Sequence, residues 1–212
     1  RGLGDVYKRQ MHYNGNRLLI AGGDLNYNGI DREGTVMYYE NGTWYNFNED
    51  GIIKQTNVKY TNTSSIAQDP SDPTHHYVSS AGHGLYEFKD FKFIKRYDYT
   101  NSPLQTILPD SPRPQDYVRC DALQYDTEGN LWMVNSEVDT ILTILKKDNT
   151  WTKLYYEELK KAPNLPAMFF DDKGRLWVLS KRNSTNKAGV FVLDYHGTLE
   201  DTSDDIHIIR KD

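Results

Sequence analysis

Apolar residues in this chain occur in short runs that are separated by glycine, asparagine, aspartate or proline. Runs such as residues 18–21, 131–134 and 167–170 are too short for typical helices and are bounded by turn-forming residues, which is typical of strands. The chain also contains 16 Tyr, 7 Phe and 4 Trp, and aromatic and β-branched side chains suit half-buried pleated surfaces. The pattern predicts an all-β chain.

One of these patterns repeats. Residues 126–134 read DTEGNLWMV, and residues 171–179, which lie 45 positions later, read DDKGRLWVL. In both copies an apolar run leads into Asp-x-x-Gly and then into a second run that opens with Leu-Trp. Asp bonds the backbone two residues further on, and Gly adopts the left-handed conformation that a bulged turn needs. Each copy therefore predicts a tight β-hairpin.

Two further strands follow each hairpin, so the repeat contains four strands. A period of 40 to 50 residues with four short strands is typical of the blades of a β-propeller. Two earlier and more divergent units keep the same strand order. The predicted strands are 18–21, 34–39 and 43–47 in the first unit, 65–68, 77–80, 84–88 and 91–97 in the second, 122–125, 131–134, 140–145 and 151–155 in the third, and 167–170, 176–179, 189–193 and 206–209 in the fourth.

The predicted fold is an all-β, partial β-propeller of about four four-stranded blades, at residues 11–60, 61–118, 119–164 and 165–212. Propellers close with four to eight blades, and closure protects the strand edges. We find no closing strand in the sequence, so we expect an open arc of a larger ring, with seven blades the expected number. The aromatic side chains of the repeats are expected to pack between blades.

The first ten residues, RGLGDVYKRQ, share neither the composition nor the periodicity of the rest. Residues 5–10 resemble the translation of an adaptor used in preparing DNA for sequencing, so we predict that residues 1–10 are a non-native segment. The chain has 25 basic and 30 acidic residues; without Arg1, Lys8, Arg9 and Asp5 these become 22 and 29, and the net charge changes from −5 to −7.

Residues 24–31, DLNYNGID, match the opening of a calcium-binding loop. An EF-hand loop closes with a bidentate Glu at its twelfth position, which is Thr35 here, while Glu33 comes two residues early. No helical pattern flanks the string. We therefore interpret it as a polar loop between the second and third strands of a blade and predict no metal site.

Other candidate chemistry is sparse. His75 and His76 are adjacent and are expected to point to opposite faces of a strand, and the six histidines are expected at turns or on the surface. The single cysteine, Cys120, is expected to be a buried thiol. No catalytic motif is present, so we predict no catalytic residues, no cofactor and no enzymatic activity, and the binding residues stay unknown.

The composition also limits the partners. The chain has no cluster of Lys and Arg, which argues against nucleic acid, and no apolar run long enough for a membrane span.

The Asp-x-x-Gly-Asn-Leu-Trp units resemble the two-component-regulator propeller repeats of exported proteins of Bacteroidetes. More narrowly, four stretches resemble PorZ-like surface components of the type IX secretion system: DPSDPTHHYVSS at 69–80, GLYEF at 84–88, YTNSPL at 99–104 and GNLWMVNS at 129–136. GTLEDTSDD at 197–205 is similar in character. The resemblance extends over nearly all of residues 14–212.

This resemblance implies an extracytoplasmic, non-catalytic scaffold or binding propeller at the outer-membrane surface. It would work in the attachment complex with other secretion proteins, handling secreted cargo or anionic lipopolysaccharide. The alternative is a periplasmic, glycan-sensing propeller of a hybrid two-component histidine kinase, whose tandem propellers carry the same general repeats. A propeller lyase or glycosidase is a third class, which would need charged residues converging on the channel.

Overall fold

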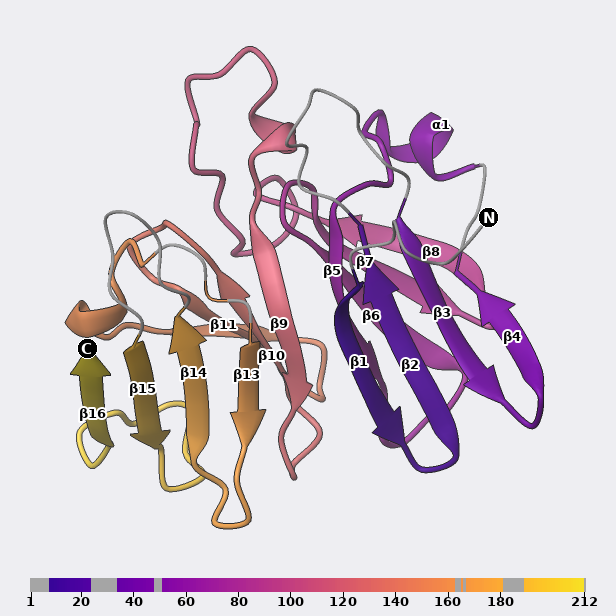
Figure 1. Cartoon of the computed structure of the whole chain (residues 1–212). Helices are drawn as coiled ribbons and strands as arrows, with labels where there is room; N and C mark the ends of the chain where they lie inside the picture. The colour runs from indigo at the N-terminus through magenta and orange to yellow at the C-terminus, as the bar shows by residue number, and fades with distance from the viewer. Residues whose placement is uncertain are drawn as a thin grey trace. The chain divides into compact units, whose positions relative to one another are not determined.

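The computed structural model describes residues 8–23, 34–47, 51–162, 165, 167–180 and 189–211. Their strands form four antiparallel sheets of four strands each, and in every sheet the strands are neighbours in chain order. Each sheet is therefore a simple meander, as expected of a propeller blade. The prediction of an all-β, partial propeller is confirmed (Figure 1).

The first two sheets comprise β1 (Lys8–Asn14), β2 (Arg17–Gly22), β3 (Thr35–Glu40) and β4 (Thr43–Asn46), then β5 (Thr63–Gln68), β6 (His75–Ser80), β7 (Gly84–Lys89) and β8 (Lys92–Tyr97). The last two comprise β9 (Cys120–Tyr125), β10 (Leu131–Asn135), β11 (Leu142–Leu145) and β12 (Trp151–Leu154), then β13 (Ala167–Phe170), β14 (Leu176–Ser180), β15 (Gly189–Asp194) and β16 (Ile206–Lys211).

The chain divides into two compact units, one up to Cys120 and one from Asp121 onward. In the first unit the two sheets share one aromatic and aliphatic core. It contains Leu19, Ala21, Val36 and Tyr38 from the first sheet and Ile66, Val78, Tyr86 and Phe88 from the second.

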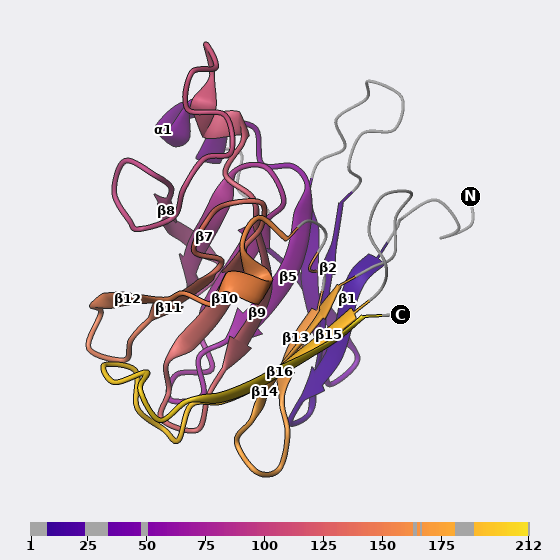
Figure 2. The same ribbon diagram turned by 90° about the vertical axis from the view of Figure 1, so that its left-hand side faces the viewer.

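A short helix, α1 (Ile52–Thr56), connects β4 to β5 and inserts Ile52 into that core. The helix ends at Asn57, whose left-handed backbone (φ 55°) lets its N–H bond the carbonyl of Ile53. α1 and the long connection from β8 to β9 lie at the same end of the first unit in both views (Figure 1 and Figure 2).

In the second unit, the third sheet packs against the fourth through aromatic rings. The centroid of the Trp132 ring lies 5.5 Å from that of Phe170 and 5.0 Å from that of Tyr195. The ring of Tyr156 packs against those of Phe191 and His207, with centroid distances of 5.4 and 4.9 Å. The expected packing of aromatic residues between blades is therefore observed within this unit.

Other aromatic residues do not follow that expectation. Tyr13 is 75% exposed and Trp44 is 48% exposed on the first sheet. Both lie in one cross-strand row with Tyr39, because Tyr13 pairs with Leu18, Leu18 with Tyr39, and Tyr39 with Trp44. The core of the first unit forms on the other face of this sheet, so these side chains are left at the surface.

The start of β1 differs from the sequence interpretation. We set residues 1–10 apart from the fold, but Lys8–Gln10 belong to β1 and pair with the end of β2. The side-chain oxygen of Gln10 also accepts a hydrogen bond of 2.6 Å from the backbone N–H of Ile66. Backbone pairing depends little on side-chain identity, so composition could not reveal this extension. The non-native origin of residues 1–10 stays a prediction.

Candidate functional site

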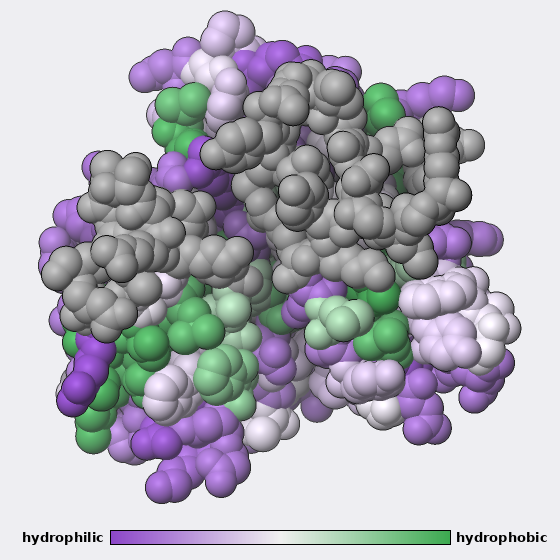
Figure 3. All heavy atoms as spheres, viewed as in Figure 1, coloured by the Kyte–Doolittle hydropathy of each residue, from purple (hydrophilic) through white to green (hydrophobic). Residues whose placement is uncertain are grey.

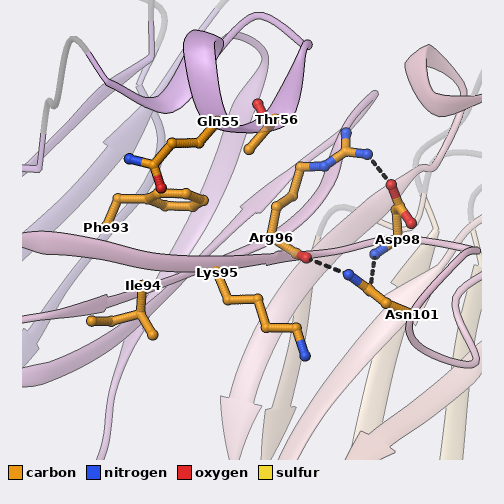
Figure 4. Close-up of a pocket in the computed structure, with 8 residues that line it drawn as sticks. All are labelled: Gln55, Thr56, Phe93, Ile94, Lys95, Arg96, Asp98 and Asn101. Atoms are coloured by element: carbon orange, nitrogen blue, oxygen red, sulfur yellow. Dashed lines mark hydrogen bonds and ion pairs between the residues drawn. The ribbon is translucent and has the colours of Figure 1, made fainter.

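A cavity of about 300 Å³ lies beside β8 in the first unit (Figure 4). Three segments line it: four consecutive residues of β8, the end of α1, and the turn that follows β8. The lining residues are Gln55, Thr56, Phe93, Ile94, Lys95, Arg96, Asp98 and Asn101. Its volume lies at the lower end of the range of ligand-binding pockets, about 300–1,000 Å³.

One wall of the cavity is built from buried, mutually bonded polar groups. Arg96 forms an ion pair with Asp98, and both side chains are about nine-tenths buried. A second nitrogen of Arg96 donates to the carbonyl of His83 at 3.3 Å. Burial lowers the pKa of Arg96, but an arginine stays charged at neutral pH. The opposite charges of Arg96 and Asp98 therefore balance each other within this wall.

The turn after β8 holds that wall in place. The side-chain oxygen of Asn101 accepts from the backbone N–H of Asp98 at 3.0 Å, and its amide nitrogen donates to the carbonyl of Arg96 at 2.9 Å (Figure 4). Asp98 accepts two further bonds from Thr100, at 2.8 Å to the backbone and 2.6 Å to the hydroxyl. The sequence after β8 is typical of a turn, but no local sequence pattern indicates the buried ion pair between Arg96 and Asp98.

The opposite wall is open to solvent. Ile94 is 53% exposed, and Lys95 and Gln55 are also exposed. Phe93 adds a nearly buried ring, and Thr56 donates its hydroxyl proton to the carbonyl of Ile52 at 2.8 Å. The cavity thus combines an ammonium group, a side-chain amide and apolar surface, a mixture that is typical of ligand-binding pockets.

A second polar cluster is centred on His83, in the loop between β6 and β7. His83 Nε2 lies 3.2 Å from the hydroxyl of Thr61, and Nδ1 lies 3.7 Å from a carboxylate oxygen of Asp116. The order acid, imidazole, hydroxyl is also that of hydrolytic triads. Thr61 is only 4% exposed and His83 only 7%, so the hydroxyl is withdrawn from solvent. We interpret the cluster as a structural contact that holds the loop of His83 against the segments of Thr61 and Asp116.

The two adjacent histidines occupy opposite environments, as predicted from strand alternation. His75 lies between two carboxylates, with Asp69 at 3.1 Å and Glu87 at 2.8 Å, and these contacts raise its pKa. His76 stacks on Tyr38 at 5.8 Å, and burial lowers its pKa to about 4. The expectation that all histidines lie at turns or on the surface is wrong for His76, which is a core residue.

The calcium-like string at 24–31 and Glu33 lie outside the described residues, whereas Thr35 begins β3. Among the residues that the structure describes, no group of three or more His, Cys, Asp or Glu side chains is arranged to hold a metal ion. The Cys120 thiol is fully buried, as predicted. The described helices include none long and apolar enough to cross a membrane.

Comparison with known proteins adds a specific relationship. PorZ, an essential bacterial surface component of the type IX secretion system of Porphyromonas gingivalis, superposes with a TM-score of 0.83 at 28% sequence identity. The match covers 98% of this chain. The chain resembles PorZ. It spans 28% of the length of PorZ. No family model and no curated protein matches the sequence.

More distant structures share the fold of this PorZ-like chain. The extracellular domain of a hybrid two-component system from B. thetaiotaomicron has a TM-score of 0.52 at 14% identity, covering 98% of this chain and 29% of that one. Streptogramin B lyase has a TM-score of 0.53 at 11% identity, covering 86% and 50%. At these identities the likeness establishes the propeller fold alone.

Proposed function

We propose that this chain is part of a non-catalytic scaffold and binding propeller in the attachment complex of a type IX secretion system. The supporting observation is the match to PorZ over 98% of the chain at a TM-score of 0.83. In this proposal the protein is extracytoplasmic, lies at the outer-membrane surface, and handles secreted cargo or anionic lipopolysaccharide together with other secretion proteins.

Deletion of the complete gene in its host tests this function. We expect secretion cargo that is normally attached to the cell surface to be lost from the surface and to accumulate in the medium. Cargo is followed by immunoblotting of washed cells and medium, with complementation by the intact gene as the control. Normal surface attachment in the deletion strain would overturn the proposal.

The alternative is a periplasmic glycan sensor of a hybrid histidine kinase, supported by the shared fold with the extracellular domain of the hybrid two-component system. The same deletion strain separates the two functions. A sensor would leave cargo attachment intact and would abolish the transcriptional response to one polysaccharide.

A further inference from the structure

We propose that His76 makes the packing between the first and second sheets sensitive to acid, because protonation of its imidazole favours an open form in which this ring reaches water. The response is independent of the proposed function, since it belongs to the packing within the first unit. Three features of the described residues support it: the burial of the ring between two sheets, the lack of hydrogen bonds to its nitrogens, and the positive charge of Arg17 nearby.

The His76 ring fills part of the contact between the two sheets. It belongs to β6 of the second sheet, and the residue is only 1% exposed. The centroid of its ring lies 5.8 Å from that of Tyr38 of β3, in a stacked arrangement, and 4.7 Å from that of Phe47, which follows β4. Phe88, the cross-strand neighbour of His76 on β7, also contacts the Phe47 ring, at 5.6 Å. The imidazole is therefore surrounded by aromatic side chains of both sheets.

The surroundings of this ring offer nothing for a charged imidazole to bind. Nδ1 and Nε2 of His76 are buried, and neither has a hydrogen-bond partner in the part of the chain that the structure describes. A charge that leaves water without a partner costs far more free energy than a neutral polar group does. His75 is the reverse case, because its nitrogens lie 3.1 Å from Asp69 and 2.8 Å from Glu87. Only the protonated imidazole of His75 can donate to both carboxylates.

Arg17 of β2 places a positive charge at the same contact. Its guanidinium carbon lies 4.6 Å from the centroid of Tyr38, the ring on which His76 stacks. Hydrogen bonds of 2.9 Å to Glu40 and 3.0 Å to Gln68 hold the guanidinium in place. Arg17 therefore opposes a proton on His76.

The other charged and titratable groups around the ring do not reverse this balance. His75 also opposes a charge on His76, whereas Asp69 and the backbone of Thr74 favour it. The Tyr38 hydroxyl stays neutral, because burial raises its pKa. Burial outweighs the favourable contacts and lowers the pKa of His76 to about 4 in the folded chain.

Acid therefore weakens this packing. The ordinary pKa of His, 6.5, applies once the ring is in water. Well above pH 6.5 the ring is neutral in both forms and costs no stability, but as the pH falls toward 4 only the open form takes up a proton. Between pH 7.5 and pH 4.5 this difference alone multiplies the equilibrium constant for opening about 70-fold.

Hydrogen exchange of the whole chain at pH 7.5 and pH 4.5 tests the proposal, since amide protection, corrected for the intrinsic exchange rate, measures opening. We expect the protection of β2 and β3 to fall about 70-fold more in the unaltered chain than in His76→Phe, which keeps an aromatic ring but cannot titrate. His12 and all carboxyl groups are present in both proteins, so their contributions cancel. The β14 and β15 amides of the second unit are the internal control and should change alike in both proteins.

His75→Gln is the matched control variant, because it removes the adjacent histidine of the same strand. The contacts with Glu87 and Asp69 raise the pKa of His75, so its charge stabilises the fold below pH 6.5 and this contribution is lost as the pH rises through the folded-state pKa. We therefore expect His75→Gln to lose more protection in acid than the unaltered chain does. Opposite shifts at adjacent positions cannot come from general acid damage.

Equal acid loss in His76→Phe and the unaltered chain would overturn the proposal, as would an acid loss that His75→Gln reduces. An NMR titration of the His76 ring in the unaltered chain gives a check that needs no variant to fold. Its midpoint is expected near pH 4, and a midpoint near 6.5 would show that the folded packing accepts the charge and that acid does not act through this ring.

Discussion

The two Asp-x-x-Gly-x-Leu-Trp hairpins of the second unit have the same local structure but different surroundings. In the β9–β10 hairpin, Asp126 accepts the backbone N–H groups of Glu128 and Asn130 at 3.0 and 2.8 Å, and its second oxygen accepts the indole N–H of Trp132 at 2.8 Å. The β13–β14 hairpin repeats this pattern from Asp171, at 3.0 Å to Lys173, 3.0 Å to Arg175 and 2.9 Å to the indole of Trp177.

The hairpins differ in what covers the tryptophan. Trp132 is fully buried against Phe170 and Tyr195 of the next sheet. Trp177 is half-buried and stacks on Phe169, at 5.9 Å with the rings nearly parallel, and Phe169 is itself 42% exposed. Apolar side chains gather on this face over the fourth sheet (Figure 3), where Ile206 and Ile208 are 62% and 58% exposed.

The comparison separates two roles of the repeated residues. The Asp and Gly residues shape the turn and hold the indole from within one hairpin, so they act alike in both copies. The contribution of the Trp to stability depends on a second sheet that the hairpin does not contain. The residues of the repeat therefore determine the turn by themselves, whereas the burial of the Trp depends on the sheet that packs against it.

Truncation of the tryptophans should give the largest difference between the copies. We expect Trp132→Ala to lower the free energy of unfolding by about 3–5 kcal/mol, because it opens a cavity in the core. Trp177→Ala should cost about 1 kcal/mol, since less surface is buried there. Urea unfolding of the chain, followed by circular dichroism, measures both.

Phe169→Ala is the control for general damage to the fourth sheet, and it should cost no more than Trp177→Ala. Equal losses for the two tryptophan variants would contradict the difference in burial between Trp132 and Trp177.

Changes at the aspartates should have a smaller effect. Asp126→Asn keeps the size of the side chain, but an amide cannot accept every bond that the carboxylate receives, which include one from the side chain of Asn130 at 2.8 Å. Because Asp126 is buried, we expect a loss of about 1–3 kcal/mol. Asp171→Asn should cost less because water reaches its hairpin more easily. Thermal unfolding of both variants measures the difference, and a larger loss for Asp171→Asn would contradict it.

The strands and turns of the hairpins could be predicted from the sequence, because they depend on residues close together in the chain. The strand at Ala167–Phe170 was predicted to the residue, and both Asp-x-x-Gly turns have the expected bond two residues on, with Gly129 and Gly174 at positive φ (86° and 75°). The bond from each indole to its Asp was not predicted, although the spacing of six residues is the same in both copies. That bond depends on strand pairing that brings the Trp back over the turn.

The candidate site was harder to predict from sequence than the strands. Its lining comes from α1, β8 and the turn after β8, and α1 has too few residues for a periodic signal. The ion pair between Arg96 and Asp98 joins residues only two apart, but its significance comes from burial, which the sequence does not show. A pocket that forms between separate elements cannot be predicted without knowing how those elements pack together.

The smallest effect is expected at the position that Asn130 occupies in one hairpin and Arg175 in the other. The Arg175 side chain donates to Asp171 at 2.8 Å and is the main cause of the lowered pKa of that carboxyl group. A lowered pKa in the folded state means that the ionised carboxylate stabilises the fold above the usual pKa of Asp, 3.8, and that this contribution is lost as the pH falls.

Arg175→Asn converts the second hairpin to the first at this position. We expect the pKa of Asp171 to rise toward its usual value and stability at neutral pH to change little, because the pair is at the surface. An NMR titration of the Asp171 carboxyl carbon measures the shift, and an unchanged pKa would show that the indole and backbone N–H groups, and not Arg175, lower the pKa of Asp171.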